Sequence, residues 1–84
     1  MIGKIVKLMR VSKNIKQSEL AKMTNIAAST ISNYEINSIS ISAENLRIIA
    51  EACNYEILFK DKESNKVYKI DDAKRFPSDI RAKK

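Results

Sequence analysis

The sequence of 84 residues has no histidine, one cysteine, one glycine and one proline. Its single cysteine, Cys53, has no second cysteine in the chain with which to form a disulfide bond. Without histidine, the chain lacks a common zinc ligand and a common general base. Gly3 is the one glycine, so no glycine-rich loop can hold a phosphate. We find no nucleophile–base pair and no paired carboxylates, and therefore expect no enzymatic activity, no metal and no cofactor.

Long apolar runs are also missing from the sequence. No stretch approaches the roughly 20 apolar residues that cross a bilayer. The opening segment MIGKIVKLMR interleaves lysines with apolar residues and lacks the apolar region of a signal peptide. We therefore expect a cytoplasmic protein with no membrane association.

The charge of the chain is clearly positive. Lysine and arginine number 16, aspartate and glutamate number 10, and the net charge is +6. A chain of this length forms one small domain with a modest core. A basic excess favours a polyanionic partner, either a nucleic acid or an anionic membrane surface, and charge alone does not choose between them.

Hydrophobic spacing predicts four helices in the first two-thirds of the chain. Residues 2–13 are expected to form an amphipathic helix whose apolar residues are Ile2, Ile5, Leu8 and Met9. Two short helices follow at 17–24 and 28–35, with a turn at 25–26. A fourth helix is expected at 43–53, with Ser42 as its N-cap.

The pattern changes after residue 54. The segments YEILFKD and KVYKID are short and rich in β-forming residues, and the polar segment KESN separates them. This arrangement predicts a β-hairpin over residues 55–71. Residues 72–84 are charged and show no period, so we expect a mobile tail or one that orders only on a partner.

The two short helices at 17–24 and 28–35 have the features of a helix-turn-helix. Ala21 is small where the two helices must cross closely, and Ile26 and Ile31 are apolar residues that fix the crossing. The outward face of the second helix is polar and short. A helix that covered a core on both sides would not carry such a face.

The pattern Q-x-x-L-A-x-x-x-N-I-x-x-S-T-I-S-x-Y-E resembles the phage repressor/Cro-type helix-turn-helix family, also called xenobiotic-response-element-like regulators. The residues that match as they stand are Gln17, Leu20, Ala21, Ile31, Ser32 and Glu35. The likeness runs from about Ile2 to Asn54. It implies a mainly α, four- to five-helix lambda-repressor-like DNA-binding domain over 1–54, followed by the hairpin at 55–71 and the tail at 72–84.

The resemblance also implies roles for individual residues. Base contacts are expected from the recognition helix at Ala28, Ser29, Thr30, Ser32 and Asn33, and phosphate contacts from Lys16, Gln17, Tyr34, Asn37 and Ser38. Arg10 and Glu35 are expected to form a structural ion pair. The helix at 28–35 has no arginine or lysine, so the commonest guanine contact is missing and an A/T-leaning half-site is expected.

The sequence departs from the family pattern at turns and caps. Asparagine replaces the usual glycine at Asn14, Asn25, Asn37 and Asn54. Asparagine tolerates the left-handed conformation better than most residues, so the turns should survive. Lys16 and Ala27 replace the usual Ser or Thr caps, and each lost cap is expected to cost about 1 kcal/mol.

The hairpin has two possible uses. It can cover the open end of the helical core, or its exposed strand edge can meet a second copy, with dimerisation through Tyr55, Ile57, Leu58 and Phe59. We favour dimerisation, with Leu58 directed toward the partner. The expected function is a transcriptional regulator, a repressor, that binds a palindromic operator in double-stranded DNA as a homodimer. The alternative is an antitoxin that holds a toxin through the hairpin or tail and represses its own operon.

Overall fold

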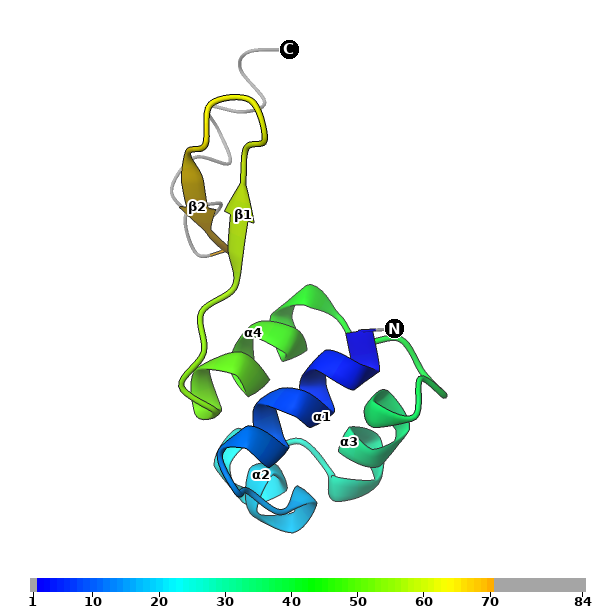
Figure 1. Ribbon diagram of the computed structural model, residues 1–84. Coiled ribbons are helices and arrows are strands. Elements are labelled where there is room, and N and C mark those ends of the chain that lie inside the picture. Colours follow the sequence, from blue (N-terminus) through cyan, green and yellow to red (C-terminus); the bar gives the residue numbers. More distant parts are fainter. Residues whose placement is uncertain (1, 71–84) are drawn as a thin grey trace.

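The computed structural model describes residues 2–70 and consists of four helices and one β-hairpin (Figure 1). The elements are α1 (Ile2–Ser12), α2 (Gln17–Thr24), α3 (Ala28–Glu35), α4 (Ala43–Ala52), β1 (Leu58–Lys60) and β2 (Val67–Lys69). The mainly helical fold with a C-terminal hairpin is therefore confirmed. The predicted tail at 72–84 lies outside the described residues.

Asparagine closes each helix of the fold. Every residue with a positive φ in the described range is an asparagine: Asn14 (58°), Asn25 (61°), Asn37 (60°), Asn54 (63°) and Asn65 (63°). The first four follow α1 to α4, and the fifth lies in the hairpin turn. The left-handed conformation strains most side chains, whereas asparagine adopts it at low cost. The replacement of glycine by asparagine therefore leaves the turns intact.

Two of the helix N-termini are stabilised by side chains, each in a different way. Ser42 Oγ accepts a hydrogen bond of 3.0 Å from the Asn45 N–H, as its position before α4 predicts. At α2 the lost cap is partly replaced, because the Glu19 carboxylate accepts a hydrogen bond of 2.8 Å from the Lys16 N–H. This bond is one half of a capping box. Ala27 carries no side chain that can cap α3.

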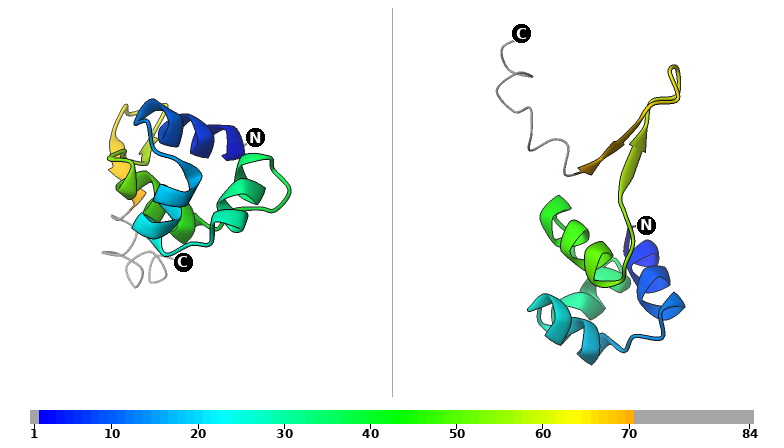
Figure 2. Two further views of the ribbon diagram at one scale, coloured as in Figure 1. Left: turned by 90° about the horizontal axis from the view of Figure 1, so that it is seen from below. Right: turned by 90° about the vertical axis from the view of Figure 1, so that its left-hand side faces the viewer.

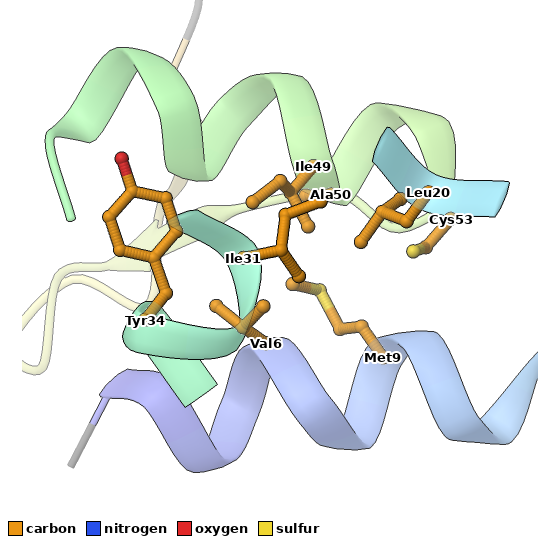
Figure 3. Packing of buried hydrophobic residues seen from close by; sticks show 8 residues of the cluster. All are labelled: Val6, Met9, Leu20, Ile31, Tyr34, Ile49, Ala50 and Cys53. Carbon is orange, nitrogen blue, oxygen red and sulfur yellow. The ribbon is translucent and has the colours of Figure 1, made fainter. Parts of the chain in front are cut away.

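The core collects side chains from all four helices (Figure 3). It comprises Val6, Met9, Leu20, Ile31, Tyr34, Ile49, Ala50 and Cys53. Leu20 and Ile31 are fully buried, and they are the residues that attach the two short helices to the body. Cys53 is a core residue, and burial raises the pKa of its thiol.

The buried face of α1 differs from the one predicted at every residue except Met9. Gly3, Val6 and Met9 point inward, whereas Ile5 and Leu8 are 48% and 66% exposed. The reason is a close approach of α1 to α3. The Gly3 N–H donates a hydrogen bond of 3.0 Å to Asn37 Oδ1, and a β-carbon on Gly3 would overlap the carbonyl oxygen of Tyr34.

The hairpin stands out from the helical body at the end opposite to α2 and α3 (Figures 1 and 2). Its two strands are antiparallel, with Phe59 paired to Tyr68 at the centre. Asp61 holds the turn, because its carboxylate accepts hydrogen bonds from the Glu63 N–H and the Ser64 hydroxyl. These bonds lower the pKa of Asp61.

The close approach of α1 and α3 predicts that Gly3→Ala is strongly destabilising. The added methyl group overlaps the backbone of α3, so the helices must separate, at an expected cost of about 2 kcal/mol. Urea unfolding followed by circular dichroism measures this loss. Lys4→Ala, on the exposed side of the same helix turn, is the control and should change stability by less than about 0.5 kcal/mol. Equal stability of the two variants would contradict the packing described here.

Candidate nucleic-acid interface

The two short helices α2 and α3 meet through a tight connection of three residues. Asn25 ends α2 in the left-handed conformation, and its N–H donates a hydrogen bond of 2.9 Å to the Ala21 carbonyl. Thr24 Oγ1 donates to the Leu20 carbonyl and accepts from the Ile26 N–H. This connection sets α3 across α2 with the geometry of a helix-turn-helix.

The inner side of α3 is fixed and its outer side is open. Ile31, Tyr34 and Glu35 are buried. Ser29 and Asn33 are four residues apart and lie on the side of the helix opposite to these three. Ser29 is exposed and Asn33 is half-buried.

The other predicted base contacts lie around this central pair. Ala28 is exposed, and Ser32 and Thr30 are half-buried on the two flanks of the outward face. The outward surface of α3 is therefore made of short side chains, of which most can form hydrogen bonds. It carries no formal charge, because α3 has no basic residue and its one acidic residue faces inward.

Tyr34 differs from the role that the resemblance implied. The side chain is 6% exposed, and its hydroxyl accepts a hydrogen bond of 2.9 Å from Asn45 Nδ2 on α4. Tyr34 therefore belongs to the core and attaches α3 to α4. We leave it out of the phosphate contacts proposed below.

A buried ion pair fixes the orientation of α3. Arg10 Nε lies 2.6 Å from Glu35 Oε2, and Arg10 Nη2 lies 3.0 Å from Glu35 Oε1. The same guanidinium donates to the Ile15 carbonyl at 2.8 Å. Arg10 therefore ties the end of α1, the segment before α2 and the end of α3 together with bidentate geometry.

The ion pair controls the protonation of Glu35. Burial by itself raises the pKa of this carboxyl group, but hydrogen bonds from Arg10 and Gln17 outweigh burial and hold the pKa below its ordinary value. Hydrogen bonding to Glu35 likewise raises the pKa of Arg10. Both side chains are therefore charged at neutral pH, and neither is presented to solvent for DNA contact.

Gln17 links this ion pair to the surface. Its Nε2 donates a hydrogen bond of 3.0 Å to Glu35 Oε1, and the residue is half-buried at the first position of α2. A glutamine amide carries two hydrogens, so one donor remains beyond the bond to Glu35. The family resemblance did not predict the hydrogen bond between Gln17 and Glu35. The two residues lie on different helices, and their spacing in the sequence does not reveal the contact.

The remaining predicted phosphate contacts lie just before α2 and just after α3. Lys16, Asn37 and Ser38 are all exposed. Asn37 is held in place by accepting the Gly3 N–H, and the Ser38 N–H donates a hydrogen bond of 2.9 Å to the Asn33 carbonyl. The loop after α3 is therefore ordered by contacts with α1 and with α3 itself.

Residues 2–70 provide neither a metal site nor a membrane span. Over this part of the chain, no group of three or more His, Cys, Asp or Glu residues is arranged to hold a metal ion. Within the same residues, no helix has the length and apolar character needed to cross a membrane.

Comparison with known proteins agrees with this geometry. A helix-turn-helix family model matches residues 6–59, which span α1 to β1. No curated protein and no solved structure matches the chain significantly.

The buried ion pair predicts a pH dependence of stability. The pKa of Glu35 is lower in the folded than in the unfolded chain, where it is about 4.3. Its contribution is therefore present above about pH 4.3 and is lost as the pH falls through the lower, folded value. Glu35→Gln should lower stability by about 3 kcal/mol at pH 7, because it leaves Arg10 without its buried counter-charge.

Urea unfolding at pH 7 and at pH 3 measures both effects. The difference in stability between Glu35→Gln and the wild type should shrink at the lower pH. Glu63→Gln changes an exposed carboxyl group at the hairpin turn and serves as the control. The ion pair would be unimportant if Glu35→Gln and Glu63→Gln had the same stability at pH 7.

Proposed function

This chain belongs to the Cro/C1-type, xenobiotic-response-element-like helix-turn-helix family of DNA-binding regulators, and we propose that it represses transcription by binding a palindromic operator as a homodimer. The observation that supports the proposal is the outward surface of α3. Its inner side is fixed by Ile31 and by the Arg10–Glu35 ion pair, while its outer side offers short polar groups. A rigid helix with such a surface fits the major groove.

The side chains of α3 suggest which bases are read. Asn33 has the amide group that pairs bidentately with adenine, and Ser29 adds a hydroxyl next to it. Ala28 and the methyl group of Thr30 can contact a thymine methyl. Because α3 offers no arginine or lysine for guanine, we propose half-sites rich in A/T, read in part through the shape of the duplex.

Phosphate contacts would hold α3 in register. Lys16 and Gln17 stand at the start of α2, and Asn37 and Ser38 follow α3, so the four residues bracket the recognition helix. Such contacts position a protein on the duplex and carry no sequence information. Gln17 would also link the phosphate to Glu35, so that docking and the orientation of α3 depend on one hydrogen-bonded group.

A single α3 of eight residues reads one short half-site. Two copies related by a two-fold axis place two such helices in successive major grooves about 34 Å apart. A palindrome with this spacing is therefore the operator that we propose. A dimer that occupies it within a promoter prevents transcription by excluding the polymerase.

Selection of bound duplexes from a random library tests the sequence-reading proposal. The wild type should recover an A/T-rich palindrome, and Asn33→Ala should lose about 2 kcal/mol of discrimination at one position of each half-site. Lys60→Ala lies on the hairpin, at the other end of the molecule, and should recover the wild-type motif. Weak binding with no recovered motif would refute a sequence-specific regulator.

The salt dependence of binding tests the phosphate contacts. Lys16→Ala should reduce the slope of log affinity against log salt by about 2 for the dimer on a palindrome, because each of the two copies releases one counterion fewer. Lys60→Ala removes the same charge from the hairpin and should leave the slope nearly unchanged. Fluorescence anisotropy at four salt concentrations measures both slopes. Equal slopes for the two variants would show that Lys16 contacts no phosphate.

A further inference from the structure

The side chains of the hairpin divide into two faces. Phe59 and Tyr68 are a cross-strand pair, and the Ile70 N–H donates a hydrogen bond of 3.2 Å to the Ile57 carbonyl, which continues the ladder toward the helical body. Because side chains alternate along a strand, Ile57, Phe59, Tyr68 and Ile70 share one face. We call it the apolar hairpin face. The opposite face carries Leu58, Lys60, Val67 and Lys69.

Within residues 2–70, only the foot of the apolar hairpin face is covered by other residues. Ile57 packs against the helical core and is half-buried, as is Ile70. Phe59 and Tyr68 are 58% and 49% exposed, because the hairpin extends beyond the helices (Figure 1). A two-stranded hairpin is at best marginally stable in water without a further layer. Two neighbouring exposed aromatic rings on such an element therefore require a cover.

We propose that the cover is the apolar hairpin face of a second copy of this chain, packed against the first about a two-fold axis that runs along the hairpins. This inference rests on the proposed function, because the palindromic operator requires a symmetric dimer. The two Phe59–Tyr68 pairs would form the centre of the interface. Aromatic pairs of this kind add attraction beyond the area that they bury.

The direction of the hairpin selects face packing over edge pairing. The hairpin points away from α2 and α3 in Figure 1 and in the right-hand view of Figure 2. Antiparallel pairing of identical strand edges uses a two-fold axis perpendicular to the strands, which would send the two α3 helices to opposite ends of the dimer. An axis along the hairpins keeps both α3 helices at the same end, where one duplex can reach them.

Charge selects between the two faces. Packing the opposite face against its copy would bring Lys60 and Lys69 of both chains together. Lys69 lies 3.1 Å from Glu56, and this ion pair is compatible with a solvent-exposed face. The predicted partner contact Leu58 lies on this opposite face.

The predicted contact Tyr55 is engaged within its own chain. Its hydroxyl lies 2.6 Å from Ser12 Oγ, and Lys13 Nζ lies 4.9 Å from the centre of its ring. Of the four residues predicted to form the dimer, Ile57 and Phe59 therefore remain in the interface that we propose.

Sedimentation equilibrium of full-length variants tests the interface. Phe59→Thr and Tyr68→Thr should each raise the dimer dissociation constant about tenfold or more, since apolar contact is lost while threonine keeps the strand propensity. Val67→Thr, a similarly exposed neighbour on the opposite face, is the matched control and should change the constant less than about threefold. The helical circular dichroism signal should be the same in all variants.

The outcomes separate this inference from the proposed function. A wild type that stays monomeric at all concentrations, or a Leu58→Thr variant that dissociates as readily as Phe59→Thr, would overturn the interface. On DNA, Phe59→Thr should bind a single selected half-site as the wild type does and lose the advantage of the palindrome. A Phe59-dependent dimer without sequence preference would support the interface and refute the repressor. A palindrome bound equally well by Phe59→Thr would support the repressor and refute the interface.

Discussion

The arrangement of the helices depends on one buried ion pair. Arg10 and Glu35 come from α1 and α3, and their hydrogen bonds extend to the Ile15 carbonyl and to Gln17. Two short helices of eight residues each have little stability of their own in water. Leu20 and Ile31 are their fully buried anchors, and the charged group adds hydrogen bonds that hold the end of α3 against α1. A structural role for Arg10 and Glu35 thus underlies the surface that α3 presents.

Turns and helix ends could be predicted from sequence because their causes are local. Ser42 and the four helix-ending asparagines act through their own backbone and nearest neighbours, so the bounds of α2 and α3 follow from the residues themselves. The matching of Arg10 to Glu35 came from the resemblance and not from spacing. The polar outward surface of α3 could also be predicted, because Ile31 and the short polar residues around it form a pattern within one helix.

Long-range contacts could not be predicted in this way. On α1 the rows Ile2–Ile5–Leu8 and Gly3–Val6–Met9 have the same spacing. Hydrophobicity favours the first row, and of the four apolar residues predicted on this helix only Met9 is buried. The choice is made by Gly3, whose missing β-carbon allows α3 to approach, and that partner lies more than 30 residues away. Tyr34 is a similar case, since its hydroxyl accepts a hydrogen bond from Asn45 of α4. The two faces of the hairpin likewise required the strand register.

The two surfaces of the molecule lie at opposite ends and differ in chemistry. The outward face of α3 carries short, mostly polar side chains, and the hairpin presents exposed aromatic residues. If two aromatic pairs form the centre of the dimer, the interface is small and the free protein associates weakly. In the dimer that we propose, each α3 would contact one half-site, and operator affinity would arise from joining two weak interactions on one duplex. Occupancy would then depend on the square of the monomer concentration, which would give a sharp response to the abundance of the protein.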